Sequence, residues 1–189
     1  MPRPRILVFA GSIRIGALSA RLAALAVKEL TLLDAEVTQI SLADYPMPLY
    51  DGDLEAREGV PEAAKKLRAL MAAHRGVYIA TPEYNASLPP LLKNTIDWIS
   101  RVRDPADPFR NRVFAIGATS NGRLGGYRAL IALRQVLELG LTALVLPEQV
   151  AIREAGQAFD EDGQLRDERM ARLLRTSLTR LIAVAEADL

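Results

Sequence analysis

The residues best suited to hold a ligand lie at positions 11–19, directly after a continuous apolar run at 6–10. A loop between a buried strand and a helix presents backbone N–H groups and a helix start, which favour an anion and most often a phosphate. Ser12 and Ser19 add hydroxyl groups, and Arg14 adds a permanent charge whose fork matches phosphate oxygens. The alternative is an ordinary helix start, with Ser19 as its cap and Arg14 in solvent.

The spacing within this loop excludes two common nucleotide motifs. An ATP-binding loop requires Gly-Lys-[Ser/Thr], which the chain lacks. A dinucleotide fingerprint requires G-x-G-x-x-G and an acidic residue near the end of the second strand. Here only Gly11 and Gly16 occur, and the expected second strand at 36–40 is followed by Ser41. The pattern therefore favours the phosphate of a mononucleotide.

A second candidate loop, at 81–87, follows another apolar run. Pro82 and the pair Pro89-Pro90 stiffen it, so that its backbone amides can form a fixed array along the edge of a flat heterocycle. Tyr84 is suited to cover a ring face, and Asn85 to lock the loop by bonding its own backbone. The alternative is a plain strand-to-helix loop with a turn-forming asparagine and helix-opening prolines.

Composition limits the chemistry of the side chains. The absence of cysteine rules out disulfides, thiolate nucleophiles and zinc–thiolate sites. The one histidine, His74, leaves little room for a Ser-His-Asp triad or a metal site, and we expect it to be a cation at a helix end. A net charge of +1 gives no bulk attraction to nucleic acid or to an anionic membrane. We therefore expect no metal and no nucleic-acid or membrane partner.

The elements that position these loops alternate regularly. Apolar runs predict strands at 6–10, 36–40, 76–80, 113–117 and 141–146, and helical spacing predicts helices at 21–33, 61–73, 91–100, 124–139 and 167–186. Residues 45–53 and 154–167 are predicted to be polar surface loops. This order predicts an α/β fold, a doubly wound, five-stranded parallel sheet with helices on both faces, and residues 1–189 as a single domain.

Ligands of an open α/β sheet bind outside the carboxyl ends of its strands. The loops after the first, third and fourth predicted strands all carry small, hydroxyl or amide residues, including Ser120 and Gly122 in the loop at 118–126. No apolar run approaches the ~20 residues of a membrane span, and the N-terminus lacks a signal-peptide pattern. We therefore expect a soluble, cytoplasmic protein.

Three motifs together resemble the NADPH-dependent FMN reductase family. They are Gly11-Ser12-x-Arg14, Pro82-Glu83-Tyr84-Asn85-x-Ser87-x-Pro89 and Leu92-Lys93-Asn94-x-Ile96-Asp97-Trp98. The resemblance extends over roughly residues 5–150. It implies a flavodoxin-like fold with strand order 2-1-3-4-5 and a relationship to quinone, chromate and azo-dye reductases.

The resemblance also implies how FMN is held. Its phosphate would lie against Ser12, Arg14, Ser19 and the amides around Leu18. Ala17 stands where the family often has a serine, so that one phosphate hydroxyl is lost. The isoalloxazine would be lined, largely through backbone, by Pro82, Glu83, Tyr84 and Asn85. Ser120, Gly122, Gly125 and Gly126 would border the ring and leave space for a nicotinamide.

The implied activity is hydride transfer from NAD(P)H through FMN to a small-molecule acceptor such as a quinone, flavin, metal oxyanion or azo compound. Because the cofactor performs the chemistry, we expect no catalytic side chain. The resemblance implies a homodimer or homotetramer, with candidate contacts at Trp98, Arg101, Tyr127 and Arg128; the alternative for Trp98 is a core position. A flavodoxin-type electron carrier and a non-catalytic flavin-binding or sensor protein remain alternatives.

Overall fold

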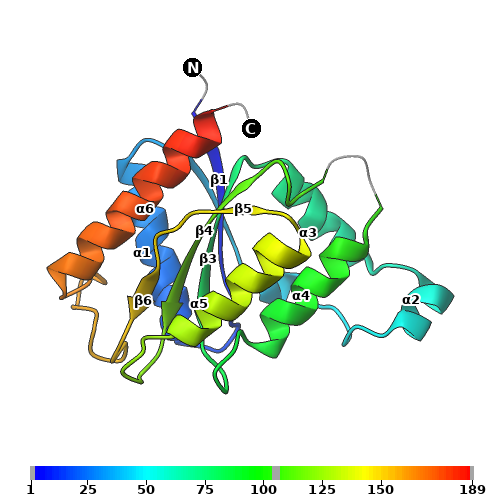
Figure 1. Ribbon diagram of the computed structural model, residues 1–189, viewed down its shortest axis with the longest axis horizontal. Coiled ribbons are helices and arrows are strands. Elements are labelled where there is room, and N and C mark those ends of the chain that lie inside the picture. Colours follow the sequence, from blue (N-terminus) through cyan, green and yellow to red (C-terminus); the bar gives the residue numbers. More distant parts are fainter. Residues whose placement is uncertain (1–2, 104–106, 188–189) are drawn as a thin grey trace.

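The sheet is the framework of the molecule, which we describe from a computed structural model covering residues 3–103 and 107–187. Within these residues six strands, all parallel, run in the order β2-β1-β3-β4-β5, and β6 also pairs with β4 (Figure 1). The predicted order 2-1-3-4-5 is therefore confirmed. The strands are β1 (Arg5–Ala10), β2 (Glu36–Ile40), β3 (Gly76–Pro82), β4 (Val113–Thr119), β5 (Leu144–Val145) and β6 (Val150–Ile152).

Helices cover both faces of the sheet (Figure 1). One face packs against α1 (Leu18–Leu32) and α6 (Glu168–Glu186). The other face packs against α3 (Glu62–Ala72), α4 (Pro90–Arg101) and α5 (Tyr127–Arg134), which continues as a π-helical turn, η2 (Gln135–Gly140). The five predicted helices are thus confirmed with ends shifted by a few residues. Two short helices were not predicted, η1 (Leu42–Asp44) and α2 (Gly52–Glu58).

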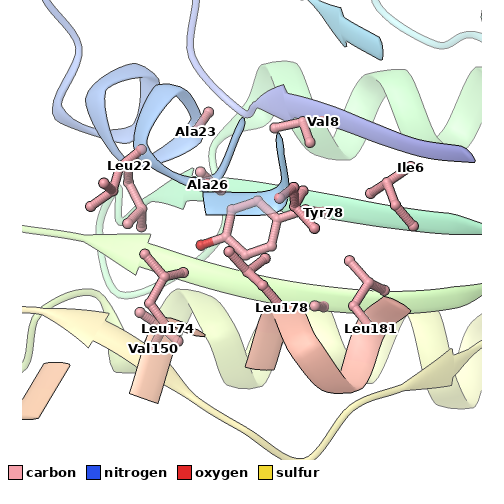
Figure 2. Close-up of a cluster of buried hydrophobic side chains, with 14 of the residues drawn as sticks. Ile6, Val8, Leu22, Ala23, Ala26, Tyr78, Val150, Leu174, Leu178 and Leu181 are labelled. Atoms are coloured by element: carbon pink, nitrogen blue, oxygen red, sulfur yellow. The ribbon is translucent and has the colours of Figure 1, made fainter. Parts of the chain in front are cut away.

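The central strands are buried on both faces, as expected for a parallel sheet covered by helices. Figure 2 shows Tyr78 of β3 among aliphatic side chains of β1, α1 and α6. A Cβ at Gly117 of the neighbouring strand would lie 2.3 Å from the Tyr78 hydroxyl, so glycine at 117 makes room for this ring. Burial raises the pKa of the Tyr78 hydroxyl, which stays neutral.

The predicted fifth strand at 141–146 is much shorter in the structure. Only Leu144 and Val145 pair with β4, at Val113 and Phe114. The chain then leaves the sheet at Pro147, which has no N–H to donate and restricts the residue before it. It returns as β6, where Val150–Ile152 pairs with residues 117–119. The edge of the sheet is therefore one interrupted strand, and β6 reaches the carboxyl end of β4.

Both predicted surface loops contain more structure than expected. Residues 45–53 lead into α2, because the Asp51 carboxylate accepts a hydrogen bond from the Asp53 N–H (2.8 Å) and caps that helix. In the segment at 154–167, Phe159 and Leu165 form an isolated antiparallel bridge and are both buried against the core. Apolar anchors spaced six residues apart lack the periodicity that identifies a helix or a strand, so the sequence pattern did not indicate them.

His74 is not a helix-end cation, which corrects the expectation from sequence. Its side chain is buried, Nδ1 lies 2.7 Å from the Leu70 carbonyl oxygen, and Nε2 lies 2.8 Å from Thr38 Oγ1. Because a carbonyl only accepts, Nδ1 carries the proton, and Nε2 of the neutral ring accepts from the Thr38 hydroxyl. Burial lowers the pKa of His74 below its ordinary value, so the neutral ring fastens α3 to β2.

The lowered pKa predicts a loss of stability in mild acid. Below about pH 6.5 the unfolded chain binds a proton at His74, whereas the folded chain keeps the ring neutral to a lower pH. The contribution of His74 to the free energy of unfolding is therefore fully present above that pH and decreases as the pH falls. One such proton contributes at most about 1.4 kcal/mol per pH unit. In urea unfolding at pH 7.5 and 5.5, His74→Gln should lose less stability between the two pH values than the wild type. Equal losses would contradict the assignment.

Candidate functional site

Three loops meet at one edge of the sheet, at the lower end of the view in Figure 1. Strands β1, β3 and β4 are neighbours in register, with Ala10 beside Ala80 and Pro82 beside Thr119. The loops that follow these strands therefore start within one or two strand spacings of each other, roughly 5–10 Å. Their residues are the ones that the sequence pattern singled out as ligand-binding.

The first loop is shaped as an anion cradle. The Gly11 N–H donates to the Ala80 carbonyl (2.8 Å), the Arg14 N–H donates to the Ser12 hydroxyl (3.3 Å), and the Ala17 N–H donates to the Arg14 carbonyl (3.0 Å). Gly16 turns the chain with a φ of +71°. The loop is thus held by its own backbone before any ligand arrives.

Several donors in this loop have no partner. Within the described residues, no acceptor is present for the N–H groups of Leu18 and Ser19, the first two residues of α1. The side chain of Arg14 is exposed and forms no ion pair or hydrogen bond in that part of the chain. A helix start with free N–H groups beside an unpaired guanidinium has the donor set that a phosphate requires, so the residues present fit the phosphate of FMN.

Ser19, whose hydroxyl was expected to be available to a phosphate, lies in the interior. Its side chain is fully buried, and Oγ has no hydrogen-bond partner within the described residues. The N-cap residue of α1 is Ala17, which offers no side-chain cap, so the alternative in which Ser19 caps an ordinary helix is wrong. Leu18 follows Ala17 as the first residue of α1.

The second loop is a tight turn at 84–87. Two hydrogen bonds of 3.0 Å join Tyr84 and Ser87, and the residues between them, Asn85 and Ala86, have φ values of 47° and 63°. Two successive left-handed residues define a type I′ turn, in which asparagine is favoured. The turn is locked by its backbone pair, and Asn85 contributes the left-handed conformation. The Tyr84 side chain is 45% exposed and remains available to a ligand.

Glu83 joins the second loop to the third. Its side chain is only 7% exposed, and Oε1 accepts from the Arg128 guanidinium, through Nε at 2.9 Å and through Nη2. Its other oxygen accepts from the Arg128 backbone N–H at 3.1 Å, in the first turn of α5. A carboxylate at a helix N-terminus is also favoured by the helix dipole. Glu83 therefore fixes the start of the 84–87 turn relative to α5.

Glu83→Gln should weaken flavin binding indirectly. The amide keeps one acceptor but loses the charge, so we expect a melting temperature a few degrees lower and an FMN dissociation constant about 3- to 10-fold higher. Glu148→Gln is a matched control, because Glu148 is similarly buried and pairs with Arg180 at 3.0 Å, on α6. Differential scanning fluorimetry and FMN titration should show a similar stability loss in both variants but weaker FMN binding in Glu83→Gln alone.

The third loop, at 120–126, is bound to the segment that follows β6. Ser120 donates its N–H to the Ile152 carbonyl (3.0 Å) and accepts from the Ala155 N–H (3.1 Å). Its hydroxyl also accepts from the Gly122 N–H at 3.1 Å. The Asn121 side-chain oxygen accepts from the Gly156 N–H at 2.9 Å. Residues 152–156, to which the sequence pattern assigned no role, are therefore part of the wall of the candidate site.

The candidate subunit contacts differ in exposure. Trp98 is fully buried, and its indole N–H donates to the Pro48 carbonyl at 2.7 Å, so the prediction that it contacts a partner is wrong and the core alternative is confirmed. Arg101 pairs with Glu55 at 2.9 Å, and Arg128 pairs with Glu83. Tyr127 remains 42% exposed.

A doubly wound parallel sheet with an open anion cradle at the carboxyl end of β1 defines the flavodoxin-like class of mononucleotide-binding proteins. Residues 4–157 match the family model "NADPH-dependent FMN reductase", and the chain belongs to that family. It is therefore an oxidoreductase that uses FMN and NAD(P)H. Bound FMN supplies the redox chemistry, and the residues of this chain bind and orient it.

Similar proteins cover most of the chain. An NAD(P)H-dependent FMN reductase of Pseudomonas aeruginosa is 38% identical over 179 residues, which is 94% of this chain and 92% of that protein. A quinone reductase of Escherichia coli K12 is 36% identical over 143 residues, 75% of this chain and 73% of that protein. The solved flavoenzyme NAD(P)H:(acceptor) oxidoreductase of Paracoccus denitrificans superposes with a TM-score of 0.77 at 28% identity, covering 97% of each chain.

No helix in the described ranges, 3–103 and 107–187, is both long and apolar enough to cross a membrane.

Proposed function

We propose that the protein is an NAD(P)H:quinone reductase that works through FMN bound at the carboxyl edge of the sheet. The observation that carries the proposal is that the first backbone N–H groups of α1 and the Arg14 guanidinium have no partner in the described part of the chain. Both kinds of group bind an anion such as a phosphate. In this proposal Ser12, Arg14 and the first N–H groups of α1 hold the phosphate. The segments 82–85 and 120–122 border the isoalloxazine.

The rim of the site supports a flat organic acceptor. Ile13 from the first loop, Tyr84 from the second, and Leu124 and Tyr127 from the third loop and the start of α5 are each between 42% and 54% exposed. Exposed apolar and aromatic side chains gathered around one edge favour an aromatic ligand over a metal oxyanion. The relatives named quinone reductase support the same choice.

We further propose a homodimer or homotetramer with Tyr127 at a subunit contact, a cytoplasmic location and a single domain over residues 1–189. The exposed apolar rim supports association, because such side chains at a surface favour protein contacts.

The test starts from the absorption spectrum of the protein purified with FMN. A yellow protein that bleaches with NADPH under anaerobic conditions, and whose colour returns on adding a quinone, would meet the expectation. Steady NADPH oxidation with the quinone would exclude a pure electron carrier. A colourless protein that does not take up FMN would favour the non-catalytic alternative and reject the proposal. Turnover with an azo dye but with no quinone would reject only the assignment of a quinone as the electron acceptor.

A further inference from the structure

Two arginines at the candidate site have no role in holding the flavin phosphate. Arg123 lies in the third loop, and Arg153 directly follows β6. Both are exposed, and neither forms a hydrogen bond or ion pair through its side chain with any residue in the described ranges. By contrast, Arg101, Arg128 and Arg180 are each paired with a carboxylate. An unpaired cation beside a ligand-binding edge is available to an anionic ligand.

The structure fixes these two residues beside each other. Arg123 lies in a turn closed by the hydrogen bond from the Gly125 N–H to the Gly122 carbonyl (3.1 Å). At Gly125 the two segments touch, because a Cβ there would lie 2.7 Å from the backbone nitrogen of Arg153. The bonds of Ser120 and Asn121 to residues 152–156 hold the same junction from the other side. The backbones of Arg123 and Arg153 are therefore held close together at one corner of the site.

This corner is too far from the cradle to share its phosphate. The cradle follows β1, whereas Arg153 follows β6, and the sheet order places β3 and β4 between them. Three strand spacings amount to roughly 14 Å. Within the two segments that form the corner, 120–126 and 150–156, the two arginines are accompanied by one acidic residue, the exposed Glu154. The corner therefore keeps a net positive charge and can accept a second anion.

We propose that Arg123 and Arg153 form a subsite for a phosphate group of the nicotinamide dinucleotide co-substrate. The dinucleotide carries a pyrophosphate, and NADPH carries an additional 2′-phosphate, for which a nearby arginine is a known type of partner. A nicotinamide placed on the flavin over β3 and β4 has its phosphates free to reach the β6 corner. The inference rests on the flavin position proposed above and does not depend on the identity of the electron acceptor.

The backbone of this corner is consistent with a built site. Glu154 adopts a φ of +47°, a left-handed conformation that is costly for a residue other than glycine. The turn is nevertheless held, since the Gln157 N–H donates to the Glu154 carbonyl (2.9 Å) and the Ala155 N–H donates to Ser120. The backbone of Arg153 is thus held by a defined turn before any ligand binds.

The experiment compares Arg123→Ala, Arg153→Ala and the double variant in the FMN-loaded protein, without any acceptor. Dissociation constants of NADP⁺, NAD⁺ and 2′,5′-ADP are measured by calorimetry. Each single variant should weaken NADP⁺ and 2′,5′-ADP binding on the order of tenfold, the size of one charge-assisted contact, and the double variant should weaken it further. Arg169→Ala removes an exposed arginine in the first turn of α6; it is the control for the loss of one positive charge and should change nothing.

The outcomes separate the two phosphate sources and the possible failures. Weaker NADP⁺ binding with unchanged NAD⁺ binding assigns the subsite to the 2′-phosphate, and equal losses for both assign it to the pyrophosphate; either supports the proposal. Partial rescue of the binding affinity by Arg153→Lys is expected in both cases. Unchanged affinities for all three ligands would overturn the proposal, as would loss of bound FMN, which would assign the arginines to the flavin instead. Because these binding measurements contain no electron acceptor, their result does not depend on whether the protein reduces quinones.

Discussion

Arg14→Ala should raise the dissociation constant of FMN about 10- to 100-fold and leave that of riboflavin unchanged. The two flavins differ by the phosphate alone, and Arg14 is the exposed, unpaired cation of the loop that we assign to it. A hydrogen bond to a charged group contributes about 1.5–3 kcal/mol, which corresponds to this range. Quenching of flavin fluorescence on titration with apoprotein measures both constants.

The fold should not respond to this substitution. Arg14 has no partner in the described part of the chain, so the free energy of unfolding of the apoprotein should change by less than about 0.5 kcal/mol. Arg169→Ala serves as the control for a general loss of positive charge. If FMN and riboflavin weaken equally in Arg14→Ala, the phosphate assignment is wrong and Arg14 acts on another part of the flavin.

Gly125→Ala should destabilise the protein by about 2–4 kcal/mol and reduce its FMN affinity. Gly125 has a φ of +61°, and a Cβ there would lie 2.8 Å from the Ala151 carbonyl oxygen and 2.7 Å from the Arg153 nitrogen. These neighbours are backbone atoms of the sheet edge and cannot turn aside as a flexible side chain can. The third loop must therefore move away from β6.

Gly163→Ala is a close control for this prediction. Gly163 has a similar φ of +75°, but nothing lies within 4 Å of the position of its Cβ. It should show only the cost of the left-handed conformation, about 1–2 kcal/mol. Urea unfolding of the two variants isolates the contribution of the close approach. Equal losses would mean that the contact between the third loop and β6 does not constrain the chain.

Much of the framework was predictable because its signals are local. The buried strands β1, β3 and β4 are largely continuous apolar runs, and glycine or proline marks the limits of β1 and β3. Alternation with amphipathic helices then leaves few topologies, since parallel strands require crossover connections. The anion cradle was predictable for the same reason, because Ser12, Arg14 and the start of α1 lie within eight residues of each other.

The predictions that were wrong concern contacts between distant segments. His74 looked like a helix-end cation until β2 placed Thr38 against its ring, 36 residues away in the chain. The pattern of its own helix allows Trp98 to lie either at the surface or in the core. The segment around Pro48 packs over its ring and accepts a hydrogen bond from its indole N–H, which places Trp98 in the core. Periodicity describes the face that a residue occupies on its own element and carries no information on what covers that face.

The sequence by itself determined the class of fold, the family and the place of the first candidate loop, because each depends on short-range pattern or motif. Only the tertiary structure showed that the short strand β6 brings residues 152–156 against the third loop, and that Glu83 holds the turn at 84–87 to α5 across 45 residues. Such pairings depend on where the edge of the sheet ends and on which backbones approach closely. Those distances are set by the packing of the whole chain, so no local pattern of residues encodes them.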